Sequence, residues 1–457
     1  MASFRFHIHS LLAGLGLLVP LAPVRADLVT DWNSEALNFM ASSAESPFIT
    51  RDLAMLNIAI YNAGESIRGV YNTYSTASYS VGSGPAGASL EAAMSTAAYE
   101  VMRGLYGDSS GFTSLYATQM GGIAAGQAKD DGELWGQSIA ASILSWRDTD
   151  GSGVAAGTPY APVGTVGYWQ QTSTAGALLP GWGNVDTFSI NSTSGYTSSL
   201  PVSSVANYLT TEQYAADFNQ VKDLGAHSSL TRTADQTSQA YFWTGISGTV
   251  KVPQLWNEIA TNAAATAGLD VFDTARLFAA MNVAMADAGI AAFAQAYSTQ
   301  FWRPETAIAN GGDGFFDTDG NPDTMGDVWL PLIDSPSFPE YVATTAAYSA
   351  AAAAVLAEFL GDNHNFSLGS DIDSSGSIDM TRNYTSFSQA ADEAAQSGIY
   401  AGIQFGTSVT DAQALGGDIA SQVVASNFAP VPEPAGALLI LLGCGMGLLG
   451  RRRRAGW

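Results

Sequence analysis

The sequence predicts an all-α fold, a helical bundle whose helices are joined by long irregular loops. Several segments place apolar residues at the three- and four-residue spacing of one helix face, and strand-like alternation is weak throughout. No segment repeats at a fixed period. With 457 residues and 47% hydrophobic content, the chain can bury one large core or two ordinary ones, which excludes a wholly disordered protein.

Residues 1–26 have the order of a secretory signal peptide. Arg5 precedes an apolar run from Leu11 to Leu21, and Val24-Arg25-Ala26 stands before Asp27. The run is too short to span a bilayer comfortably, and its order of charge, apolar segment and small residue is that of an export signal. We therefore expect export, with a buried N-terminal helix as the alternative.

Four segments of the body predict helices. The first two carry one apolar face, whereas the third is Ala-rich and apolar nearly all round, so it is expected at the centre with neighbours on every side. Residues 158–201, rich in Gly, Ser, Thr, Pro and aromatics, predict a long irregular connection that packs on the surface. The four helices are Leu90 to Gly107 with Ser89 as cap, one capped by Asp273 or Thr274, Tyr341 to Leu360, and Ser388 to about Phe405.

The C-terminal residues consist of three parts in a fixed order. Sixteen uncharged residues at 1.5 Å each reach about 24 Å, marginal for a hydrocarbon core, and an arginine cluster favours the cytoplasmic side. The parts are Pro432, Glu433 and Pro434, then 435–450, then Arg451, Arg452, Arg453 and Arg454. This order resembles the PEP-CTERM sorting signal of Gram-negative bacteria. The resemblance implies transient inner-membrane insertion, cleavage by an exosortase-type enzyme, and transfer to the cell surface or matrix; a plain membrane anchor is the alternative.

The chain is thus divided into a signal peptide at 1–26, a body at 27–427 and a sorting signal at 431–455. The net charge of the whole chain is -24. Six arginines and one acid, Glu433, lie in the two end segments. The part between Asp27 and Pro430 therefore has 17 − 6 = 11 cations and 41 − 1 = 40 acids, a net charge of -29. Phosphate binding needs clustered cations, so nucleic acid is excluded as a partner. The single Cys444 cannot form an intramolecular disulfide.

Several blocks of the body form a recognisable set of motifs. They are residues 275–308, Trp146-Arg147-Asp148, Thr231 to Thr237, Asp319-Gly320-Asn321-Pro322, Phe338-Pro339-Glu340-Tyr341 and Ser386 to Ala394. Together these blocks resemble the vanadium-dependent haloperoxidase family, kin to the acid and lipid phosphatases of the PAP2 superfamily. The resemblance covers nearly all of Asp27 to about Asn427 and implies their helical-bundle fold. It also implies an anion cage for vanadate or phosphate, in which cations and donors converge on an oxyanion.

The family pattern has a Lys seven residues before the Arg of Arg-Pro, a Pro-Ser-Gly-His block opening the central helix, and an Arg followed six residues later by a His. Arg303 matches the Arg of Arg-Pro. The other positions are replaced: Ala296 stands for the Lys, Val342-Ala343-Thr344-Thr345 for Pro-Ser-Gly-His, Gly398 for the second Arg, and Gln404 for the ligand or nucleophile His.

These replacements predict a degenerate oxyanion site. At about 2 kcal/mol for each lost charge contact, losing the Lys and one Arg weakens oxyanion binding roughly a thousandfold. Gln404 cannot act as a base. We expect no bound vanadate, and we expect Arg303 to pair with an acid such as Asp287 or Glu305. Asp287 is expected to be a satisfied structural carboxylate, and His227 and His364 surface loop residues.

A second candidate site is a calcium loop. Asp371, Asp373, Ser375 and Asp379 supply oxygen atoms at positions 1, 3, 5 and 9, with Gly376 at position 6. Position 12 is Arg382 where a bidentate Glu should stand. Asp317 to Asp323 and Asp148 to Ser152 are weaker, partial versions, and turns in solvent are the alternative for all three.

Three functions remain open from the sequence. The first is an exported, surface-sorted pseudoenzyme of the haloperoxidase/PAP2 fold with a structural or interaction role in the extracellular matrix. The second is an active haloperoxidase or phosphatase with a rebuilt site. The third is a Ca²⁺-dependent module that binds surface polysaccharide.

Overall fold

A computed structural model describes residues 27–41, 44–172, 174, 176–196, 200, 204–310 and 329–428, and it confirms the helical class. The expected signal peptide, the sorting signal and the weaker loop at 317–323 lie outside these residues. The helices are α1 Asp27–Met40, α2 Ser46–Arg68, α3 Leu90–Tyr106, α4 Ser110–Gly121, α5 Gln127–Arg147, α6 Ser152–Ala155, α7 Val205–Tyr208, α8 Glu212–Gly225, α9 Ala234–Thr244, α10 Val252–Ala267, α11 Val271–Thr299, α12 Pro304–Ala309, α13 Thr344–Leu360, α14 Phe387–Tyr400 and α15 Gly406–Val423. Two strands, β1 Asn363–Ser370 and β2 Met380–Ser386, form a hairpin.

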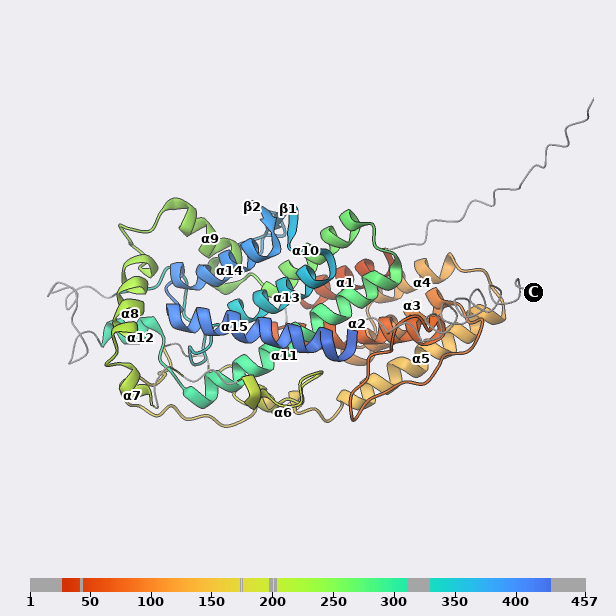
Figure 1. Ribbon diagram of the computed structural model, residues 1–457, viewed down its shortest axis with the longest axis horizontal. Helices are drawn as coiled ribbons and strands as arrows, with labels where there is room; N and C mark the ends of the chain where they lie inside the picture. Colours follow the sequence, from red (N-terminus) through yellow and green to blue (C-terminus); the bar gives the residue numbers. More distant parts are fainter. Residues whose placement is uncertain are drawn as a thin grey trace, which may run out of the picture.

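Helix α11 organises an elongated molecule (Figure 1). It packs against α2 of the N-terminal helices and against α13 and α15 of the C-terminal ones, so a single apolar core runs through both groups. Among the described helices α11 alone is long and apolar enough to cross a membrane. Its most apolar stretch is 94% buried inside the protein, as expected for the core helix of a globular fold.

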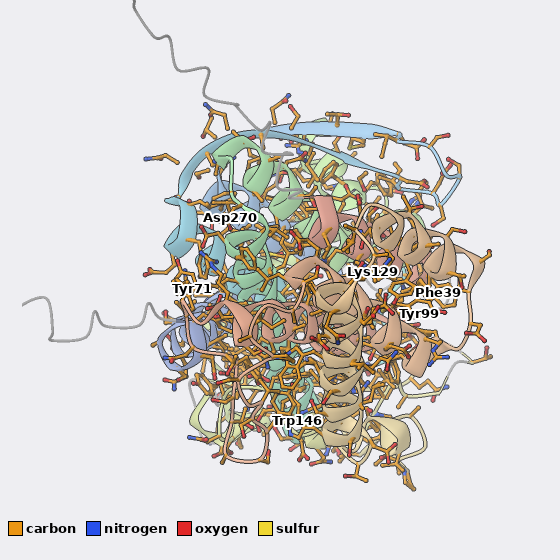
Figure 2. The ribbon with its side chains drawn as sticks, turned by 90° about the vertical axis from the view of Figure 1, so that its right-hand side faces the viewer. Phe39, Tyr71, Tyr99, Lys129, Trp146 and Asp270 are labelled. Carbon is orange, nitrogen blue, oxygen red and sulfur yellow. The ribbon has the colours of Figure 1, made fainter. Side chains whose placement is uncertain are left out.

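The N-terminal end of the molecule is built from α1 to α5 and is seen end-on in Figure 2. Aromatic rings bind its helices together: Tyr99 stacks on Tyr116 with centroids 4.5 Å apart, and Phe39 of α1 contacts Tyr106 of α3 at 5.1 Å. Lys129 donates a hydrogen bond to a carbonyl at the end of α4. These contacts close the bundle without a disulfide.

A buried ion cluster joins α2 to the end of α5. Asp150 accepts from Arg51 Nε at 2.7 Å and from Arg147 Nε at 3.0 Å on one oxygen. Its other oxygen accepts from the backbone N–H and the hydroxyl of Ser152. The turn at 148–152, a weak calcium-loop candidate in the sequence, therefore has its central carboxylate fully engaged by protein donors.

The predicted helices are present, with corrected ends. The first agrees at both ends, because the Ser89 hydroxyl accepts from Ala92 N–H and Gly107 follows the last turn. The second begins earlier than predicted: Asp270 is its cap, accepting the N–H groups of residues 272 and 273. The third begins at Thr344. The fourth, α14, ends at Tyr400, and Gly402 follows with φ 80°, a conformation that a non-glycine residue rarely adopts.

The hairpin was not predicted, because its strands are mostly polar and half-exposed and carry no sustained apolar alternation. Phe366 pairs with Tyr384 and Ser370 with Met380 in antiparallel register. Residues 371–379 form its tip, so the calcium-loop candidate connects two strands rather than two helices. Arg382, at position 12 of that candidate, lies on β2.

The described residues of the connection at 158–201 are irregular as predicted, but they are anchored in the core rather than lying on the surface. Its side chains Trp169, Trp182 and Phe188 are all at most 2% exposed. The Asp287 carboxylate of α11 accepts the backbone N–H groups of Phe188, Ser189 and Ile190 at 2.6, 2.8 and 3.0 Å. Asp287 is thus the structural carboxylate predicted, and burial raises its pKa to about 6 although these three donors oppose the shift.

Candidate functional site

Three buried polar side chains from separate segments meet at the predicted oxyanion site. Arg303 lies just before α12, Glu340 precedes α13, and Gln404 lies between α14 and α15. They are 1%, 0% and 4% exposed, respectively. We call them the Arg303–Glu340–Gln404 cluster. Such burial of charged groups requires partners within the protein.

Backbone carbonyls surround the Arg303 guanidinium. Nε donates to Phe338 O at 3.0 Å, Nη1 to Ile403 O at 2.9 Å and Nη2 to Pro339 O at 3.4 Å. The guanidinium also lies over the Phe338 ring, 4.6 Å from its centroid. These acceptors hold Arg303 as a structural bridge between the segment before α13 and the segment before α15.

The Gln404 side chain lies between the two charged residues. With its amide oriented to satisfy both neighbours, its oxygen accepts from Arg303 Nη1 at 3.0 Å and its nitrogen donates to Glu340 Oε1 at 2.5 Å. The backbone N–H of Phe405 donates to the same carboxyl oxygen at 2.9 Å. Four of the five guanidinium N–H groups therefore have protein acceptors.

Burial dominates the electrostatics of the cluster. Burial lowers the pKa of Arg303 to about 10, and the nearby Glu340 carboxyl opposes that shift. Burial raises the pKa of Glu340 to about 8, opposed by Arg303 and by the Phe405 N–H. At neutral pH the protonated form of Glu340 is therefore favoured, and the second carboxyl oxygen has no hydrogen-bond partner among the described residues.

Gly398 and Gln404 are in direct contact. The Gly398 carbonyl accepts the N–H groups of Ile403 at 3.0 Å and Gln404 at 3.1 Å, which folds the chain back on itself after α14. A Cβ atom at position 398 would lie 2.7 Å from Cγ of Gln404. The glutamine side chain thus occupies space that any larger residue at 398 would need.

Of the remaining predicted positions, Ala343 is linked to this cluster through Ser408, which contacts Gln404. Ala343 donates its N–H to Ser408 O at 3.4 Å, which sets the start of α13 beside the first turn of α15. Thr344 and Thr345 are half-buried in that first turn of α13. Ala296 is wholly buried near the end of α11. These positions offer a methyl group where a cation was expected and hydroxyl groups without a neighbouring imidazole.

Glu340 is the site residue that the sequence reasoning missed, and the expected partners of Arg303 were wrong. Both carboxylate oxygens of Asp287 accept hydrogen bonds from the backbone N–H groups of residues 188–190. Glu340 acts on Arg303 more strongly than Glu305 does. A sequence signal existed: Glu340 stands between apolar neighbours, Phe338-Pro339 and Tyr341-Val342, in a chain with few cations. A carboxyl group in such a segment is expected to be buried with a partner.

The calcium-loop candidate brings three of its predicted residues together. Oxygen atoms of Asp371, Asp373 and Asp379 lie within 4.8 Å of one another at the hairpin tip. The same carboxylates accept backbone N–H groups of the turn, including Ser375 at 2.9 and 3.0 Å and Gly376 at 2.7 Å. These bonds stabilise the turn without a metal ion, so calcium binding remains a prediction.

The residue at position 12 of that loop, Arg382, is an arginine where a bidentate Glu would be needed, and it pairs with acids of two helices. Arg382 forms ion pairs with Glu393 of α14 at 2.6 Å and with Asp235 of α9 at 2.9 Å. It therefore ties the hairpin to two helices. His227 is an exposed turn residue as predicted. His364 is not in a loop: it lies on β1, half-buried, and stacks on Phe387 with ring centroids 5.2 Å apart.

Comparison of the chain with known proteins identifies relatives. Residues 276–431 match a family model described as the VCPO second helical-bundle domain. A vanadium chloroperoxidase of Curvularia inaequalis is 31% identical over 120 residues, which is 23% of this chain and only 18% of that relative.

Solved structures extend the likeness to most of the chain. The first bacterial vanadium-dependent iodoperoxidase has a TM-score of 0.74 at 23% identity, covering 90% of this chain and 99% of the iodoperoxidase. A holo-type bacterial vanadium-dependent chloroperoxidase has a TM-score of 0.64 at 14% identity, covering 84% and 93%. At such identities the superpositions establish a shared helical fold.

Proposed function

The chain is related to the vanadium haloperoxidase family, and from that relation we propose that it is a non-catalytic relative whose oxyanion site has become a structural cluster. Its role is then structural or one of interaction, in the extracellular matrix. The observation that carries this proposal is the environment of Arg303, whose donors point at three backbone carbonyls and at the Gln404 amide.

The chemistry of oxyanions supports this proposal. A vanadate or phosphate group needs several cations and donors that converge on it and are free to bind it. Here four of the five N–H groups of the one cation already have protein acceptors, and an anion that needs several of them would first have to break hydrogen bonds that cost about 1–3 kcal/mol each to leave unmade. Glu340 would add a carboxyl group where negative charge must be accommodated.

The cluster also lacks a group that could replace the missing imidazole. The Gln404 amide is neither a base nor a vanadium ligand of the imidazole kind. Glu340 has a pKa near the useful range but is fully buried beneath Gln404 and Arg303. An active enzyme with a rebuilt site would have to open this cluster before substrate could reach either group.

A halide-oxidation assay tests the proposal. The purified body is incubated with vanadate, bromide or iodide, and hydrogen peroxide, beside a vanadium chloroperoxidase as positive control. We expect no halogenation above a blank without vanadate, and no saturable vanadate or phosphate binding by calorimetry. Vanadate-dependent turnover that disappears in Arg303→Ala, but survives in the exposed control Arg103→Ala, would establish the active alternative instead.

Export and surface sorting belong to the same proposal and rest on the two ends of the sequence. Residues 1–26 would direct export, and residues 431–455 would insert briefly in the inner membrane before an exosortase-type enzyme cuts near Pro434. Mass spectrometry of the surface-released protein checks this: we expect a C-terminus close to the Pro-Glu-Pro motif. Release with Arg451 to Arg454 still attached would contradict processing at that motif.

A further inference from the structure

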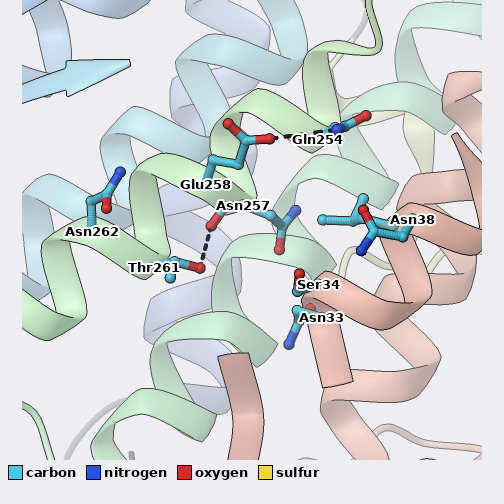
Figure 3. Close-up of a pocket in the computed structure, with 9 residues that line it drawn as sticks. Asn33, Ser34, Asn38, Gln254, Asn257, Glu258, Thr261 and Asn262 are labelled. Atoms are coloured by element: carbon cyan, nitrogen blue, oxygen red, sulfur yellow. Dashed lines mark hydrogen bonds between the residues drawn. The ribbon is translucent and has the colours of Figure 1, made fainter. Parts of the chain in front are cut away.

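A polar groove lies between α1 and α10, far in sequence from the cluster described above (Figure 3). Its volume is about 200 Å³. The lining residues follow helical spacing on both sides, with Asn33 and Asn38 among those from α1 and Asn257, Glu258 and Asn262 among those from α10. Two polar helix faces are thus turned toward each other, which is unusual for the inner faces of packed helices. We call this the α1–α10 groove.

The floor of the groove is made of two amides that are fixed in place. Asn33 and Asn257 are each 1% exposed. The nitrogen of Asn33 donates to a carbonyl one turn earlier and to Asn57 Oδ1, both at 2.8 Å. The nitrogen of Asn257 donates to a carbonyl one turn earlier at 2.8 Å and to Asn282 Oδ1 at 3.0 Å.

These bonds decide what the floor can offer a ligand. Both N–H groups of each amide are used, while each oxygen accepts one bond from its partner amide, Asn57 or Asn282. An amide oxygen has two lone pairs, so each floor amide can accept at most one further bond, and it has no N–H group left to donate. The floor is therefore rigid and can serve a ligand only as an acceptor.

The walls combine further acceptors with donors. Glu258 is half-buried, and its carboxyl receives only a long bond of 3.4 Å from Gln254. The Thr261 hydroxyl donates to the backbone carbonyl of Asn257 at 2.9 Å, leaving its oxygen as an acceptor. The amides of Asn38 and Asn262 are exposed at the rim and can donate. Figure 3 shows Ser34 and Asn38 of α1 opposite Asn257 of α10.

This pattern selects one class of ligand. No Lys or Arg is among the described residues that line the groove, and the chain has a net charge of -24, so an anion is repelled. A simple cation or amine would use the acceptors but make no hydrogen bond to the rim amide donors, which are exposed to solvent. A sugar hydroxyl donates and accepts at once and can therefore satisfy the floor oxygens, the Glu258 carboxyl and the rim amides together. The volume equals that of about seven waters, the scale of a single sugar ring.

We propose that the α1–α10 groove binds one ring of a neutral, hydroxyl-rich saccharide. The proposal deepens the interaction role put forward above by naming a ligand class, and it does not depend on calcium. It rests on the proposed function only for the location, the extracellular matrix, in which the protein would encounter a saccharide. The groove shares no residue with the Arg303–Glu340–Gln404 cluster. Saccharide binding in the groove and the loss of catalysis at the cluster can therefore be refuted independently.

Calorimetric titration of the whole body tests the groove. Maltose, cellobiose and chitobiose serve as neutral probes, digalacturonate as an acidic probe and spermidine as a cationic probe, all without calcium. We expect saturable binding of at least one neutral probe and none of digalacturonate. Asn262→Ala and Glu258→Gln should each weaken that binding about tenfold, the loss expected from one hydrogen bond.

Two matched exposed substitutions, Asn191→Ala and Glu212→Gln, should leave the affinity unchanged. Thermal melting of the Asn262→Ala and Glu258→Gln variants checks that a loss of binding is not a loss of folding. No saturable heat with any neutral probe overturns the proposal, as does binding that both groove variants leave intact. Binding of spermidine alone, abolished by Glu258→Gln, would make the groove an amine site and also overturns it. Haloperoxidase activity of the protein would refute the proposed function but would not affect the conclusion from the saccharide titration.

Discussion

The Gln404 amide gives the sharpest test of the cluster, because its two ends contact opposite kinds of group. Gln404→Ala removes the acceptor of Arg303 Nη1 at 3.0 Å and the donor to Glu340 Oε1 at 2.5 Å. Each of these buried groups keeps another partner, Ile403 O and Phe405 N–H respectively, so the loss of one bond costs about 1.5 kcal/mol for each group, the lower end of the range for charged groups. The cavity left by the shortened side chain adds about 1 kcal/mol. We therefore expect a loss of about 4 kcal/mol in the free energy of unfolding.

Urea unfolding followed by tryptophan fluorescence measures this loss. Gln404→Met fills nearly the same volume without an amide, so it separates hydrogen bonding from packing and should still cost about 3 kcal/mol. Gln422→Ala, an exposed glutamine on α15, is the matched control and should change stability by less than about 0.5 kcal/mol. If the stability losses of Gln404→Ala and Gln422→Ala differ by less than about 1 kcal/mol, the amide does not bridge Arg303 and Glu340 and the reasoning fails.

Other predictions follow from single groups. Glu340 has a pKa of about 8 in the folded protein, against an ordinary value of 4.5. Its contribution to the free energy of unfolding is therefore fully present below pH 4.5 and is lost as the pH rises to 8. That loss of stability is at most about 5 kcal/mol. Glu340→Gln should flatten the pH dependence of stability measured by urea unfolding. An unchanged slope in this variant would assign the pH dependence to other groups. Asp287→Asn should cost about 2–4 kcal/mol by thermal melting, because its NH₂ would face backbone N–H groups, while the exposed control Asp418→Asn should cost almost nothing. The calcium alternative predicts a binding heat that Asp371→Ala abolishes; equal heats in both proteins would remove it.

Much of the architecture could be predicted from local pattern. The α3 helix was found at both ends because its cap, stripe and terminal glycine are neighbours in sequence. The start of α11 was misplaced because Asp270, Asp273 and Thr274 are all good caps, and only the chain path decides which one accepts the first N–H groups. The hairpin was missed because cross-strand pairs such as Phe366 with Tyr384 lie 18 positions apart and leave no periodic signal.

For the candidate site, the sequence by itself determined which groups are absent. Ala296, Gly398 and Gln404 cannot supply the cations and imidazole of an anion cage in any conformation, since side-chain chemistry is fixed by residue type. Only the tertiary structure decided what became of Arg303, the cation that remains. Its partners, Glu340 and Gln404, are 37 and 101 residues away, and burial of all three in one place forces them to satisfy one another. The α1–α10 groove arises in the same way, because polar faces over 200 residues apart become a site only when the two helices pack together.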